Sequence, residues 1–208
     1  MKILVAVPCM DQVPAQFAQS IATLNSVGEC SIAFQMGSLV YDSRNALAAN
    51  ALKMEADYVL WLDSDMVFPP DVLERLMKDR DKGDIVTAVY YRRVAPYSPV
   101  LLDKLEIDDT GCEWTNMKKV PDKGIFEVAG CGFGCVLMPT KIFADVLAEF
   151  GNLFAPIKGV GEDLSFCWRA RKCGYKIVCD PDIQLGHVGH YIVDQKFFKA
   201  YGGALNEG

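Results

Sequence analysis

Apolar runs of strand length alternate with helical patterns through the first half of the chain. Uninterrupted runs of this kind are typical of strands that are covered on both faces, as in parallel sheets. The runs occupy residues 2–8, 31–35, 58–62 and 84–91. Between them, apolar residues recur at helical spacing at 14–27, at 43–56 and from Pro69 onward. The alternation predicts an α/β domain in which helices flank a mostly parallel sheet.

After Arg93 the pattern changes to short apolar runs that are broken by turn residues. Two clusters rich in Asp, Gly and Pro, at 108–111 and 121–124, lie within residues 96–137. They predict hairpins, or a smaller mixed sheet attached to the first half. The remaining expected elements are helices at 140–150 and 163–173, and a strand at 175–179 that ends before Asp180-Pro181-Asp182.

Length and composition favour one globular domain. The chain has 208 residues, of which 51% are hydrophobic and 23% are charged. This balance excludes disordered and fibrous proteins. No Ser- or Pro-rich linker divides the chain, so residues 1–208 are expected to form a single domain whose two halves meet after residue 93.

Charge and hydropathy narrow the possible partners. The chain carries 21 basic and 27 acidic residues, and the net charge of −6 argues against a general nucleic-acid binder. No apolar run approaches the ~18–20 residues that cross a bilayer. Pro8 and Asp11 interrupt the pattern of a secretory signal. The sequence therefore predicts a cytoplasmic protein without a membrane span and without an evident nucleic-acid surface.

The eight cysteines contain no C-x-x-C pair. Only Cys131 with Cys135, and His187 with His190, approach the paired spacing of a structural zinc site. A chain of this length with this much aliphatic content can build a core without disulfides. We therefore expect reduced, mostly buried thiols.

Two aspartates follow the apolar run 58–62 directly, in the segment Asp63-Ser64-Asp65. Ligands of open α/β sheets bind beyond the carboxyl ends of the strands, where both carboxylates can reach. Hard oxygen ligands of this type suit Mg²⁺ or Mn²⁺, and such a cation can neutralise a diphosphate. The same residues are also typical of a turn and helix cap before Pro69.

A second acidic pair, Glu162-Asp163, opens the predicted helix at 163–173. Carboxylates at a helix start are favoured by the helix dipole alone. A carboxylate held rigidly at the same crevice can also take a proton from an attacking hydroxyl. His187 follows the last strand and could complete a metal site as a neutral imidazole, or be an exposed loop residue like His190.

The order of these segments resembles the GT-A glycosyltransferases and is similar to the large family 2 group. The resemblance spans roughly residues 3–190. The segments that carry it are V-P-C at 7–9, Ser43-Arg44-Asn45, L-D-S-D at 62–65, F-P-P-D at 68–71, G-E-D-L-S-F-C-W-R-A-R-K-C-G-Y at 161–175 and a late Gly-His. The resemblance implies that residues 1–93 bind a nucleotide sugar and that 94–208 form the acceptor and catalytic half.

The resemblance also implies roles for individual residues. Asp65 would hold a divalent cation, Mn²⁺ or Mg²⁺, with Asp63 near the cation or the ribose and His187 as a third ligand. Asp163 would be the base that activates the acceptor, with support from Glu162. The other implied donor-side and sugar-side positions are Pro8, Cys9, Arg44, Asn45, Ser64, Gly132, Phe133 and Gly134.

Two details leave the donor nucleotide and its contacts undetermined. The segment Gln35-Met36-Gly37-Ser38 has no carboxylate where the family often has an acidic pair that helps to bind the base, so the donor can be a UDP- or a GDP-sugar. Arg92 and Arg93 follow the fourth predicted strand and either add positive charge to the leaving group or form a solvated strand end. The sequence identifies neither the acceptor nor the oligomeric state, and it does not separate inverting from retaining transfer.

Two other functions compete with sugar transfer. Residues 59–67 match the D-x-D-x-[TV] pattern of HAD-type phosphatases, in which Asp63 would be the nucleophile. That motif normally lies on the first strand, whereas here two strand–helix units precede it. A non-catalytic module that binds a sugar or a nucleotide is the third interpretation. The residues that argue against it are the intact Asp63, Asp65, Asp163 and His187.

Overall fold

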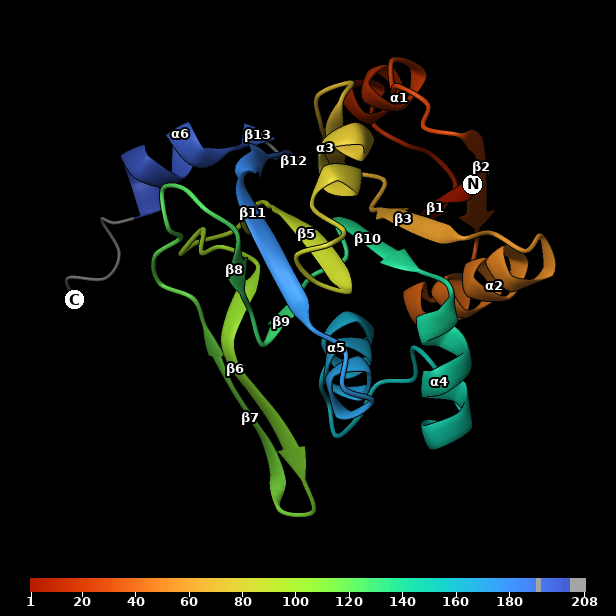
Figure 1. Ribbon diagram of the computed structural model, residues 1–208. Coiled ribbons are helices and arrows are strands. Elements are labelled where there is room, and N and C mark those ends of the chain that lie inside the picture. The colour runs from red at the N-terminus through yellow and green to blue at the C-terminus, as the bar shows by residue number, and fades with distance from the viewer. Residues whose placement is uncertain (190–191, 203–208) are drawn as a thin grey trace.

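The structure is a computed structural model that describes residues 1–189 and 192–202. Its centre is a seven-stranded sheet with the order β2-β1-β3-β10-β5-β11-β8 (Figure 1). These strands are β1 (Lys2–Cys9), β2 (Glu29–Met36), β3 (Tyr58–Leu62), β5 (Ile85–Val89), β8 (Phe126–Glu127), β10 (Cys135–Pro139) and β11 (Ile177–Gln184). Parallel pairs join β2 to β1, β1 to β3 and β5 to β11. The predicted mostly parallel α/β fold is confirmed.

Helices cover both faces of this sheet. The first three are α1 (Ala15–Ala22), α2 (Val40–Lys53) and α3 (Val72–Lys78), and the later ones are α4 (Lys141–Phe150), α5 (Glu162–Lys172), α6 (Gln195–Phe197) and the π-helix η1 (Phe198–Gly202). Buried side chains of α1 and α3 belong to one core cluster, and those of α2, α4 and α5 belong to the other. Strand β1 contributes to both clusters, because Leu4 and Ala6 face one layer while Ile3, Val5 and Val7 face the other.

Two small three-stranded sheets complete the fold. One has the order β13-β12-β4, and the other has the order β7-β6-β9. Their strands are β4 (Met66–Val67), β12 (Gly186–Val188), β13 (Ile192–Val193), β6 (Leu101–Asp108), β7 (Gly111–Asn116) and β9 (Gly130–Cys131). The β6–β7 hairpin turns at the predicted 108–111 cluster and extends away from the body of the protein (Figure 1).

The observed elements differ from the expected ones in several respects. Strand β10 lies antiparallel between β3 and β5, whereas no strand was expected at this position. Strand β11 continues through Pro181 to Gln184, because an irregularity between Asp180 and Gln184 absorbs the proline. Helix α1 ends at Ala22, which is earlier than the helical pattern up to residue 27.

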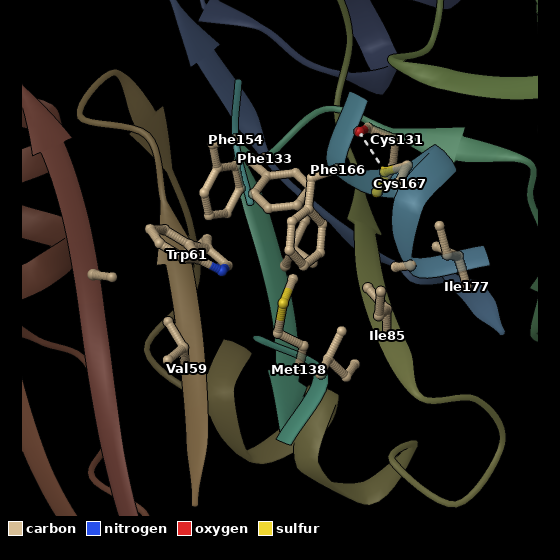
Figure 2. Close-up of a cluster of buried hydrophobic side chains, with 14 of the residues drawn as sticks. Val59, Trp61, Ile85, Cys131, Phe133, Met138, Phe154, Phe166, Cys167 and Ile177 are labelled. Carbon is tan, nitrogen blue, oxygen red and sulfur yellow. Dashed lines mark hydrogen bonds between the residues drawn. The ribbon is translucent and has the colours of Figure 1, made fainter. Parts of the chain in front are cut away.

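Aromatic side chains fill the layer between the sheet and helices α4 and α5 (Figure 2). The rings of Phe154 and Phe166 stack with centroids 4.7 Å apart, and Phe133 meets both rings edge-on. Trp61 of β3 contacts the same cluster through Phe154, with centroids 5.2 Å apart. Trp61 of β3 and Phe166 of α5 both belong to this cluster, so its packing holds these two elements, which end and begin at Asp63 and Glu162, in the same layer.

All eight cysteines are unpaired, and four of them, Cys131, Cys135, Cys167 and Cys179, are buried. Among the described residues, no helix has the length and hydrophobicity that crossing a bilayer requires. The cytoplasmic location stays a prediction.

Replacing Phe166 by Ala tests the aromatic layer. Phe166 is fully buried, and we expect the substitution to lower the free energy of unfolding by about 3–5 kcal/mol, measured by urea denaturation. Trp114→Ala is the control, because Trp114 is 48% exposed on the β6–β7 hairpin. An equal loss in the two variants would show that the layer does not hold the fold together.

Candidate active site

A cavity of about 410 Å³ opens at the carboxyl ends of β1 and β3. This is the edge at which an open α/β sheet binds its ligands. The cavity is lined by ten of the residues to which the sequence analysis gave a candidate role, which are Pro8, Cys9, Arg44, Asp63, Ser64, Asp65, Arg93, Glu162, Asp163 and His187. The other lining residues are Met10, Ser38, Val40 and Ser43.

Arg44 of α2 lies beneath the cavity and links two of its carboxylates. Its Nη2 donates to Asp63 Oδ1 at 2.7 Å, and its Nε donates to Glu162 Oε1 at 3.2 Å. The guanidinium also lies 5.7 Å from the ring centre of Trp61 and 5.2 Å from that of Phe133. Burial alone would lower the pKa of Arg44, but the two carboxylates outweigh burial and raise it. Arg44 is therefore a permanent cation inside the site.

A second group of charges surrounds Asp65. Its Oδ2 lies 2.6 Å from Arg93 Nη1 and 3.3 Å from His187 Nε2. His187 reaches Asp65 because β12 pairs with β4, which places His187 opposite Met66. Val188 N also donates to Asp65 O at 2.7 Å. Burial would raise the pKa of Asp65, but the contact with His187, together with the charge of Arg93, outweighs burial and lowers it.

His187 is oriented by its other ring nitrogen. Nδ1 lies 2.8 Å from the carbonyl oxygen of Tyr91, which can only accept, so Nδ1 carries a proton. Nε2 of the neutral ring then presents its lone pair to Asp65. Burial would lower the pKa of His187, but the Asp65 carboxylate outweighs burial and raises it. Either a proton on Nε2 or a metal ion is therefore favoured between these two side chains.

Asp163, in the first turn of α5, differs electrostatically from its neighbour Glu162. Its Oδ1 accepts from the backbone N of Leu164 at 2.7 Å, and among the described residues it makes no ion pair. Burial, reinforced by the charge of Glu162, raises the pKa of Asp163 to about 6, although Arg44 opposes the shift. A carboxylate that titrates near neutrality in a cavity is suited to proton transfer.

The donor set around Asp65 fits a divalent cation whose remaining ligands would be water or a bound phosphate. Within residues 1–189 and 192–202, no three His, Cys, Asp or Glu side chains form a metal-binding group. Asp65 and His187 provide one oxygen and one nitrogen that face each other, and a hydrogen bond holds the histidine as in protein metal sites. Mg²⁺-type sites commonly use one or two protein ligands together with phosphate and water. His190, the alternative histidine, lies outside the described residues.

Five singled-out residues do not line the cavity. Asn45 turns away, and its Oδ1 accepts from Phe154 N at 3.3 Å. Arg92 is exposed and makes a backbone hydrogen bond to Ser98, so it is the neighbouring Arg93 that contacts Asp65. The two arginines lie in the irregular segment after β5, where the chain begins to bend, and the sequence could not show which of them faces the site.

The other three residues, Gly132, Phe133 and Gly134, lie under the site. Phe133 is fully buried in the aromatic layer. Tyr90 packs against the glycines, and a Cβ on Gly132 would lie 2.1 Å from the Tyr90 hydroxyl. Gly134 N donates to that hydroxyl at 3.2 Å. The small residues therefore admit a buried tyrosine that supports the floor of the site.

Sequence reasoning quoted Ser38 and Ser43 within longer segments but did not predict that they pair at the cavity. Their hydroxyl oxygens lie 2.7 Å apart at the start of α2. Ser38 precedes α2 and Ser43 lies in its first turns, and the N-cap position, Leu39, has no side-chain hydrogen bond. No local sequence pattern showed that the two hydroxyls meet.

Comparison with known proteins places this geometry in context. The Anp1 family profile matches residues 36–99, which is less than half of the chain. No curated protein sequence matches the chain. The structure of A197 from STIV superposes with a TM-score of 0.64 at 19% identity, covering 91% of this chain and 86% of that chain.

The structure of GalNAc-T7 with UDP, GalNAc and Mn²⁺ superposes with a TM-score of 0.60 at 11% identity. The match covers 92% of this chain but 43% of that chain, so this chain spans less than half of that protein. At these identities the two superpositions establish the fold.

Replacing Asp163 by Asn tests its electrostatic environment. With a native pKa of about 6 against an ordinary value of 3.8, the native carboxyl keeps its proton where the unfolded one has lost it. The Asp163 carboxyl therefore lowers the free energy of unfolding of the wild-type protein as the pH rises from about 4 to 7. The Asn variant escapes this penalty and should gain up to about 3 kcal/mol relative to wild type. Urea denaturation at both pH values in EDTA measures the gain, and a difference independent of pH would contradict the assignment.

Proposed function

We propose that this chain, which has the GT-A fold of glycosyltransferases, transfers a sugar from a nucleotide-sugar donor to an acceptor hydroxyl. The observation that carries the proposal is the meeting of Asp63, Asp65, Asp163 and His187 in one cavity from three distant parts of the chain. The resemblance to family 2 enzymes and the neighbour solved with UDP and Mn²⁺ support the same proposal.

The donor lies at the carboxyl ends of β1 and β3 in this proposal. Pro8 and Cys9 border its nucleoside, while Asp65 and His187 hold Mn²⁺ or Mg²⁺. When bound, the cation would stabilise the charge of the departing diphosphate. Arg93, which already faces Asp65, adds a positive charge on the same side. Asp63, held by Arg44, provides a fixed carboxylate for a ribose hydroxyl.

Asp163 is the base in this proposal. It takes the proton of the acceptor hydroxyl as the acceptor oxygen bonds to the anomeric carbon and the bond between that carbon and the diphosphate oxygen breaks. Its raised pKa suits this step, because a base that titrates near the working pH is deprotonated and still accepts a proton readily. A base that acts on the acceptor belongs to inverting transfer, whereas a retaining enzyme would not depend on Asp163.

A panel of UDP- and GDP-sugars with Mn²⁺ and candidate acceptors tests the function, with released nucleoside diphosphate as the readout. We expect Asp65→Ala to lose metal-dependent turnover, and His187→Ala to need at least about tenfold more Mn²⁺ because one ligand is lost. His190→Ala, at the other histidine, is the control. Equal effects of the two histidine variants would reject the cation assignment.

The same panel, extended by a phosphate monoester and by thermal shift measurements, separates the alternatives. A HAD-type phosphatase would depend on Asp63 as a nucleophile and would release inorganic phosphate from a phosphate monoester. A binding module would show donor-dependent thermal stabilisation without turnover.

Asp163→Asn tests the base directly. We expect turnover to fall by at least about 10²-fold, as is typical when a general base is removed, while donor affinity measured by calorimetry stays within about twofold because Asp163 faces the acceptor. In wild type, kcat/KM should fall as the pH drops below about 6, since the base is then protonated. Loss of donor binding in the variant would assign Asp163 to the donor side instead.

A further inference from the structure

We propose that Arg44 is a positioning residue that ties Asp63 on the donor side to Glu162 on the acceptor side. The inference rests on the proposed function and adds that the two acidic residues at the start of α5 have different roles. Glu162 anchors Arg44, and its neighbour Asp163 is left to act on the acceptor.

The first support is the location of the three residues. Arg44 belongs to α2, Asp63 follows β3 directly, and Glu162 is the first residue of α5. Arg44 and Glu162 are 118 residues apart in sequence. Two different nitrogens of one rigid, planar guanidinium contact the two carboxylates. The distance between the end of β3 and the start of α5 is therefore set by the guanidinium itself.

The second support is that Arg44 is poorly placed to bind a ligand. Its side chain is 2% exposed. Nε and Nη2 are already used by carboxylates, and Nη1 is buried without a hydrogen-bond partner. The rings of Trp61 and Phe133 lie close to the guanidinium. Arg44 lines the cavity, but with two nitrogens engaged by carboxylates and the third buried it can organise the site without donating a hydrogen bond to the donor.

The third support is the contrast between Glu162 and Asp163. The Glu162 carboxylate is 14% exposed and is engaged by Arg44, whereas Asp163 makes no ion pair with any described residue. The contact with Arg44 fixes the position of the Glu162 carboxylate, whereas the Asp163 carboxylate lines the cavity without a contact of this kind. The structure thus gives the two neighbouring acids different tasks, which their sequence positions alone did not separate.

A double-mutant cycle with Arg44→Met and Glu162→Gln tests the link. We expect each single variant to lower kcat by about 10- to 100-fold, because small misplacements of reacting groups cost rates of this order. The donor KM should stay within about threefold. The double variant should lose little more than the worse single variant, since both remove the same link.

Arg169→Met is the matched control. Arg169 is also a buried arginine, 4% exposed, but it donates to the carbonyl oxygens of Leu153 and Ala155 rather than to carboxylates. Its loss should lower the melting temperature while kcat per folded molecule stays within about twofold. If Arg44→Met does not fold, Arg44→Lys replaces it, because the single ammonium of lysine cannot hold both carboxylates in the same geometry.

Two results would overturn the proposal. The first is an Arg44 variant with a donor KM raised at least tenfold and an unchanged kcat, which would make Arg44 a donor ligand. The second is additive loss in the double variant. If the wild-type protein transfers no sugar, the proposed function fails, and the cycle is then measured by melting temperature. Additive melting-temperature losses would reject the Arg44 link, and non-additive losses would support it without the transferase.

Discussion

Four carboxylates share one cavity, and their mutual repulsion is the constraint on which the rest of the site depends. Asp63, Asp65, Glu162 and Asp163 line the same space, and carboxylates this close cannot all stay charged without compensation. The fold compensates unequally. Arg44 pairs with Asp63 and Glu162, and Arg93 and His187 face Asp65. Asp163 has no ion pair among the described residues, and burial, reinforced by the charge of Glu162, raises its pKa.

Because the compensation is unequal, the packing of the core determines which charges surround each carboxylate. The aromatic layer that holds β3 against α5 also surrounds the guanidinium of Arg44. The small sheet formed by β4 and β12 brings His187 to Asp65, and Tyr90 beneath Gly132 and Gly134 supports the floor. Some of the acidic residues that give the chain its net charge of −6 therefore line the cavity, where cationic side chains lie beside them.

Much of this arrangement was predictable from local sequence patterns. The run of β3 was predicted to the residue, because it is apolar throughout and stops abruptly at Asp63. The position of Asp63 and Asp65 at the cavity follows from that boundary and from the rule that ligands bind beyond strand ends. The start of α5 was found within one residue from its acidic first turn.

What the sequence could not show depends on contacts between distant segments. Strand β10 is apolar on both faces, and such a run has the same pattern in either direction, so its antiparallel position stayed hidden. The pairing of Arg44 with Glu162 joins helices that no local pattern relates. Whether Arg93 or Arg92 contacts Asp65 depends on the orientation of the short segment after β5.

A crystal structure with Mn²⁺ and a nucleoside diphosphate tests the central claim, which is that this cavity holds the donor. The account predicts Mn²⁺ coordinated by Asp65 and His187, with the diphosphate on the metal and Arg44 still joined to Asp63 and Glu162. A diphosphate bound elsewhere, or bound in this cavity with Mn²⁺ away from Asp65, would contradict it.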